Sequence, residues 1–127
     1  MKTILLCATE DNNRKKVERF LRKMKYRFIV SDNIDDAFRS FRRNKADLLL
    51  LSGAIKTEDQ ASLRESVRHI DKTIPVLFYD VVGSFALSNQ ISFSAIDDVV
   101  FSGSTAKELS WRIRGLLKQS QSMRNQS

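Results

Sequence analysis

The sequence predicts an α/β protein with one doubly wound, five-stranded parallel sheet flanked by five helices. Five short apolar segments recur along the 127 residues and alternate with segments whose apolar residues repeat at helical spacing. Several short segments are apolar without alternation, as is typical of strands buried on both faces of a parallel sheet. Because strand-helix-strand crossovers are right-handed, successive helices are then distributed over both faces of the sheet.

The strands are predicted at the short apolar segments, each of which is too short for a helix. They are residues 3–8, 27–30, 47–51, 76–79 and 99–101. A chain of this length corresponds to one domain.

The first and last predicted helices have the clearest amphipathic pattern. Apolar residues at i, i+3, i+4 and i+7 form a stripe that faces a core. The first stripe is Val17, Phe20, Leu21 and Met24, and the last is Leu109, Ile113, Leu116 and Leu117. A third helix is expected over residues 60–70, and a fourth, with a weaker pattern, over residues 84–91.

Polar residues mark the start of another helix and the end of the domain. Asp32 or Asn33 precedes an acidic turn, which suits an N-cap at the positive end of the helix dipole. From Gln119 the chain is polar and has no apolar period. We therefore expect a domain over residues 1–118 and a flexible tail or linker over residues 119–127.

The composition argues against most simple enzyme classes. The chain has one histidine, His69, and one cysteine, Cys7, so neither a metal site nor a Ser-His-Asp triad finds its partners at the required spacing. The four glycines are isolated, which excludes a glycine-rich phosphate loop. No apolar segment is long enough to span a membrane. We expect a cytoplasmic protein that is not an enzyme and holds no cofactor or metal.

Four segments follow one another at characteristic spacing: residues 4–7, 47–51, 75–78, and 97–100 continuing to Glu108 and Leu109. In this order they resemble the receiver domain of bacterial two-component response regulators, over residues 3–118. The resemblance rests on the register of all the segments together. It implies a flavodoxin-like sheet and a site at the carboxyl ends of the strands.

In the family, an aspartate at the end of the third strand accepts a phosphoryl group, and an acidic pair after the first strand holds Mg²⁺, a cation that prefers oxygen ligands. Other residues occupy these positions here. Ser52 stands at the position of the phosphoacceptor, and Ala8 and Thr9 stand at the positions of the acidic pair. Asp80 replaces a hydroxyl residue of the family. Ser102 replaces a lysine, and Gly103 after it replaces a proline. The resemblance therefore implies a pseudo-receiver without aspartyl phosphorylation.

Further departures from the family pattern lie nearby. Val99 replaces an aromatic residue of the fifth strand, and Lys56 and Gln60 stand where the family tends to have proline and glycine. Ser52 lacks the adjacent base that a serine nucleophile needs.

A shift of register by one residue would bring Glu10 or Asp11 toward Asp80 and create a weak site for a divalent cation. In the other interpretation, Asp11 or Asn12 caps the first helix and Asp80 is solvated. The sequence leaves both open.

Positive charge is concentrated in two segments of the chain. Residues 14–27 contain eight lysines and arginines and one acidic residue. Residues 104–127 contain five lysines and arginines and one acidic residue. In a receiver-like fold the first and last helices lie side by side, so the two segments should merge. Trp111 is expected on the outward side of the last helix, surrounded by Lys107, Arg114 and Lys118. An outward tryptophan is typical of interface cores.

These features predict a phosphorylation-independent regulatory module that acts by protein-protein contact in bacterial signalling or transcription control. The expected surface is the Trp111 face and the fourth helix near Phe85 and Leu87. The expected partner is an output domain, another protein or a second copy of the chain.

Two alternatives stay open. One is a basic domain that contacts nucleic acid. The other is a flavodoxin-like domain that binds a nucleotide or metal near Thr9, Ser52, Asp80 and Ser102, since doubly wound sheets bind ligands at this edge.

Overall fold

Strands and helices alternate along the chain in the computed structural model, which describes residues 1–82 and 94–125. The strands are β1 (Thr3–Cys7), β2 (Arg27–Ser31), β3 (Leu48–Ser52), β4 (Val76–Val81) and β5 (Asp97–Phe101). The helices within the described residues are α1 (Asn12–Lys23), α2 (Ile34–Arg43), α3 (Thr57–Ile70) and α5 (Ala106–Asn125). The helix predicted over residues 84–91, with Phe85 and Leu87, lies outside the described residues.

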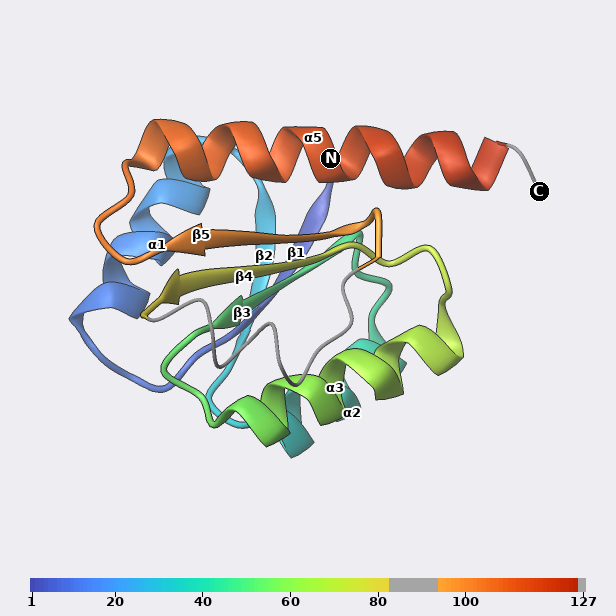
Figure 1. Ribbon diagram of the computed structural model, residues 1–127, viewed down its shortest axis with the longest axis horizontal. Coiled ribbons are helices and arrows are strands. Elements are labelled where there is room, and N and C mark those ends of the chain that lie inside the picture. Colours follow the sequence, from blue (N-terminus) through green and yellow to red (C-terminus); the bar gives the residue numbers. More distant parts are fainter. Residues whose placement is uncertain (83–93, 126–127) are drawn as a thin grey trace.

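The strands form one parallel sheet in the order β2-β1-β3-β4-β5 (Figure 1). Leu5 of β1 lies opposite Ile29 of β2 on one side and opposite Leu49 of β3 on the other. The chain therefore adds β2 to one side of β1 and the later strands to the other. This is the doubly wound arrangement that the sequence predicts, and it brings the carboxyl ends of all five strands to one edge.

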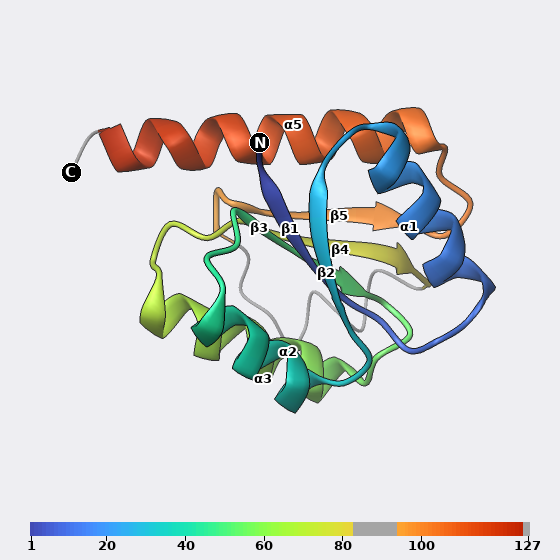
Figure 2. The same cartoon turned by 180° about the vertical axis from the view of Figure 1, so that it is seen from behind.

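Helices cover both faces of the sheet (Figure 2), and each face has its own core. β3 shows why its apolar run does not alternate: Leu48 and Leu50 pack with α1 and α5, whereas Leu49 and Leu51 pack with α2 and α3. Successive side chains of a strand point to opposite faces. A strand covered by helices on both faces must therefore be apolar at every position.

The starts of α1 and α2 confirm two of the predicted caps. The Asp11 carboxylate accepts a hydrogen bond from the Arg14 backbone N–H at 2.7 Å, and the Asn33 side chain accepts one from the Asp36 N–H at 2.8 Å. α3 begins at Thr57, three residues before the predicted start. Its first turn is polar and has no side-chain cap, so neither an apolar period nor a capping residue indicated this start in the sequence.

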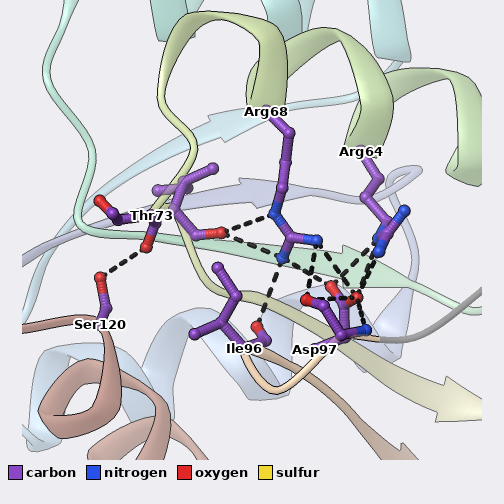
Figure 3. Close-up of polar contacts among 8 residues, drawn as sticks. Arg64, Arg68, Thr73, Ile96, Asp97 and Ser120 are labelled. Carbon is purple, nitrogen blue, oxygen red and sulfur yellow. Dashed lines mark hydrogen bonds and ion pairs between the residues drawn. The ribbon is translucent and has the colours of Figure 1, made fainter. Parts of the chain in front are cut away.

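α5 continues to Asn125, which corrects the prediction of a flexible tail from residue 119 onward. The Ser120 side chain is buried, and its hydroxyl donates to the Thr73 carbonyl oxygen at 2.6 Å (Figure 3). Arg124 donates to the Thr73 hydroxyl at 2.9 Å and to the Asp71 carboxylate at 3.2 Å. The inward stripe of α5 thus continues in polar residues, which an apolar period does not detect.

A buried carboxylate joins α3 to the start of β5 (Figure 3). The side chain of Asp97 is 0% exposed and accepts hydrogen bonds from Arg64 Nε at 3.1 Å and Arg68 Nη2 at 2.6 Å. The Ser94 backbone N–H donates to it at 2.8 Å. Burial alone would raise the pKa of this carboxyl group, but the hydrogen bonds from the two guanidinium groups outweigh burial and lower it.

The helices of the described residues lack the combination of length and apolar character that a membrane-spanning segment requires.

Candidate functional site

Four of the five positions singled out in the sequence follow directly from the strand ends at the carboxyl edge of the sheet. Ala8 follows β1, Ser52 ends β3, Asp80 is the second-to-last residue of β4, and Ser102 follows β5. Ala8 is buried and its N–H donates to the Ser31 carbonyl at 2.9 Å, whereas Thr9 beside it is exposed. Because β1, β3, β4 and β5 are consecutive neighbours in the sheet, these positions share one edge.

Ser52 is 4% exposed, and its hydroxyl is already engaged. Its Oγ accepts a hydrogen bond from the Ala54 N–H at 3.1 Å, and its side chain also bonds to the Tyr79 hydroxyl. Burial raises the pKa of Tyr79 well above its usual value, and the bond to Ser52 offsets this only in part. Ser52 therefore sits between neutral partners, and neither of them is a base that would activate it as a nucleophile.

Asp80 lies in an irregular part of β4 and has a left-handed backbone, with φ 56°. Its carboxylate accepts a hydrogen bond from the Asn13 side chain at 2.6 Å, so it is held by α1 and is not merely solvated as one interpretation predicts. Gly53 packs against the same backbone, with its N–H 2.7 Å from the Tyr79 carbonyl oxygen. These contacts connect the ends of β3 and β4 to the start of α1.

The acidic residues near this edge have different surroundings. Asp11 caps α1, Asp80 is bound to Asn13, and Glu10 is exposed. Across residues 1–82 and 94–125, no three histidine, cysteine or acidic side chains are placed together to hold a metal ion. His69 is exposed in the last turn of α3.

A groove of about 350 Å³ beside Asp80 is a feature that the sequence did not reveal. α1 contributes Lys16 and Phe20 to its lining, and α5 contributes Ala106 and Leu109. No local motif indicates the groove, because its two walls are almost ninety residues apart and meet only when both helices pack on the sheet.

The outer side of α5 carries the predicted interaction residues. Trp111 is 69% exposed, and Lys107, Arg114 and Lys118 are exposed around it. Arg112 instead donates to Asp98 of β5 at 3.0 Å and to Glu108 of α5 itself at 3.4 Å. The helical period therefore placed Trp111 correctly on the solvent side.

No family model matches the sequence. A curated relative, the transcriptional regulatory protein RprY of Bacteroides fragilis (strain YCH46), is 23% identical over 129 residues. The match covers 96% of this chain and 52% of the relative, so the chain spans about half the length of the curated relative that it matches.

Solved structures resemble the whole fold. The signal receiver domain of an HD domain-containing protein from Pseudomonas fluorescens Pf-5 aligns with a TM-score of 0.87 and 15% identity, covering 99% of this chain and 93% of that one. The receiver domain of a putative LuxO repressor from Vibrio parahaemolyticus aligns with a TM-score of 0.80 and 16% identity. This alignment covers 94% of this chain and 92% of that one.

A third structure is the receiver domain of the sensor histidine kinase PA1611 from Pseudomonas aeruginosa PAO1, with magnesium coordinated in its active-site cleft. Its TM-score is 0.76 at 19% identity, and the alignment covers 92% of this chain and 98% of that one. Together with the parallel β2-β1-β3-β4-β5 sheet, these similarities establish that the chain has the fold of response regulator receiver domains.

Proposed function

We propose that the protein is a receiver-like regulatory module of bacterial signal transduction that acts through protein contacts and without aspartyl phosphorylation. The observation that carries the proposal is the end of β3, where the buried, hydrogen-bonded hydroxyl of Ser52 occupies the position that the family resemblance assigns to the phosphoacceptor. The receiver fold and the similarity to a transcriptional regulatory protein support a role in signalling or transcription control.

The chemistry of the surrounding positions supports the same conclusion. Mg²⁺ binding and phosphoryl transfer require carboxylates and a cation around the acceptor. The end of β1 supplies the methyl group of Ala8 and the hydroxyl of Thr9, and the end of β5 supplies the hydroxyl of Ser102. The Asp80 carboxylate adds a negative charge that repels phosphate.

Incubation of the protein with acetyl phosphate and Mg²⁺ is expected to leave its mass unchanged. Intact-mass spectrometry measures the result, and the magnesium-binding receiver domain from Pseudomonas aeruginosa serves as the positive control. A stable phosphoryl adduct on any aspartate would contradict the proposal. An adduct that appears in the wild type and disappears in Ser52→Ala would also contradict it, because Ser52 would then be a substituted acceptor.

Without a chemical switch, regulation has to come from a partner that binds one conformation or assembly state better than another. The proposed contact surface is Trp111 with Lys107, Arg114 and Lys118, all exposed on α5. A large aromatic side chain surrounded by cations has the composition of an interface hot spot.

Trp111→Ala is expected to weaken self-association by about thirtyfold, the equivalent of a 2 kcal/mol hot spot, with the stability of the monomer unchanged. Light scattering over a concentration series measures this. Ile70→Ala, which truncates another exposed apolar residue at the end of α3, should have no effect. A wild-type protein that stays monomeric at high concentration would exclude the homodimer form of this proposal.

A further inference from the structure

α1 presents more positive charge than the acids of the described residues neutralise. Its acid, Glu18, is engaged by Arg14 at 3.4 Å and by Arg22 at 3.9 Å. The other cations of the helix are exposed, and none of them forms an ion pair with an acid of the described segments. These residues, which we call the α1 basic surface, are Lys15, Lys16, Arg19 and Lys23.

The helices on the opposite face of the sheet are balanced in charge. α2 contains two acids and three arginines, and α3 contains three acids and two arginines. Arg39 pairs with Asp36 within α2, and both arginines of α3 form ion pairs with Asp97. The excess of positive charge is thus a property of one face of the molecule.

α5 lengthens this positive face. It lies on the same side of the sheet as α1 (Figures 1 and 2). Leu109 and Ile113 of α5 belong to the same buried cluster as Val17 and Leu21 of α1. Lys107, Arg114 and Lys118 are exposed on it and have no ion-pair partner within the described segments. α1 itself has 12 residues and is about 18 Å long, and duplex DNA carries one phosphate per strand every 3.4 Å, so α1 alone is long enough to follow several phosphates.

The character of α1 favours phosphate over a protein partner. Protein interfaces need an apolar centre that loses its water. The exposed large apolar residues of the described segments are Met1, Ile70, Val82, Phe101 and Trp111, and none of them belongs to α1. Contacts with a nucleic-acid backbone are wet and cationic, and they need no such centre.

We propose that the α1 basic surface binds the phosphate backbone of duplex DNA without reading its sequence. Counterion release from the DNA would drive the binding, and the mutual repulsion of four neighbouring cations would be relieved in the complex. This activity goes beyond the protein contacts proposed above. Its failure would leave the result of the acetyl phosphate experiment unaffected.

The test is fluorescence anisotropy of a labelled duplex of about 20 base pairs, titrated with the full chain between about 50 and 200 mM salt. The test variant is Lys15→Ala/Arg19→Ala/Lys23→Ala. The matched control is Arg42→Ala/Arg43→Ala/Lys45→Ala, which removes the same charge from exposed positions at the end of α2, on the other face. Alanine is a good helix former, so both variants should fold, and thermal melting verifies this.

The wild type is expected to bind with a Kd on the order of 10 to 100 μM, with an affinity that falls steeply with salt. The α1 variant should bind at least about tenfold more weakly. The slope of its log affinity against log salt concentration should be smaller in magnitude by about two to three, because each lost phosphate contact reduces this slope by about 0.9. The control should stay within about twofold of the wild type.

Three results would overturn the proposal. The first is no binding by the wild type at the lowest salt. The second is equal weakening of both variants, which would mean attraction by net charge alone. The third is displacement of the DNA by polyglutamate at equal charge concentration, which would identify an acidic protein as the better partner.

Discussion

Asp97→Asn is expected to lower the free energy of unfolding by about 3 kcal/mol, because it leaves two guanidinium groups without their buried counter-charge. Asparagine has nearly the same shape as aspartate, so the loss reports on charge and hydrogen bonding and not on a cavity. Arg64 and Arg68 both donate to this carboxylate, and their side chains are only 17% and 16% exposed. Urea denaturation followed by circular dichroism measures the effect.

The neighbouring acid provides the control. Asp98 also pairs with an arginine, Arg112 at 3.0 Å, but its side chain is 31% exposed and that of Arg112 is 44% exposed. Because water screens this pair, Asp98→Asn should cost less than about 1 kcal/mol. Equal losses in the two variants would show that the Asp97 cluster is no more important than a surface ion pair.

The pH dependence of stability gives the Asp97 prediction a second readout. The pKa of Asp97 is lower in the folded protein than its ordinary value of 3.8. Its stabilising effect is therefore complete above that ordinary value and is lost as the pH falls through the lower, folded pKa. Between pH 7 and pH 3 the wild type should lose more stability than Asp97→Asn, which has already lost this carboxylate.

Gly53→Ala is expected to destabilise the protein by about 2 kcal/mol, because the added methyl group has no space and meets backbone. A Cβ at this position would lie 2.7 Å from the Asp80 carbonyl oxygen and 2.9 Å from the Val81 Cα. Relief would require the end of β3 to move away from β4, at the point where Asp80 already adopts a left-handed backbone. Thermal and urea denaturation measure the change.

Gly115→Ala is the matched control and should change stability in the opposite direction. Gly115 lies within α5, and an added Cβ would meet nothing within 4 Å. Alanine at an open position inside a helix should raise stability by about 1 kcal/mol relative to glycine. If both substitutions stabilised the protein, the close contact between Gly53 and β4 would be refuted.

Properties that depend on neighbours in the chain were predictable from sequence. The apolar residues of β3 predicted a strand covered on both faces, and packing of alternate leucines into two cores confirms it. Asp11 and Asn33 were recognisable as caps because their hydrogen-bond partners lie only three residues away. The period of α5 placed Trp111 outward for the same reason.

The candidate site was predictable only as a set of positions. Ser52 and Asp80 were assigned by the family resemblance, and strand order then places them at one edge of the sheet. The hydrogen bond between Ser52 and Tyr79 depends on the pairing of β3 with β4. The hydrogen bond between Asp80 and Asn13 depends on the position of α1. Side-chain partners of this kind have no local pattern.

The sequence by itself determined the strand and helix alternation, the amphipathic faces and the concentration of charge in α1, because all of these follow from spacing within a few residues. Only the tertiary structure decided that α5 continues past residue 118 and that Asp97 is a buried junction. Ser120 bonds to Thr73, 47 residues away, and Arg68 to Asp97, 29 residues away. In the sequence, polar residues with such distant partners look like solvent-exposed residues. Folding removes water from them, and they then form hydrogen bonds with each other.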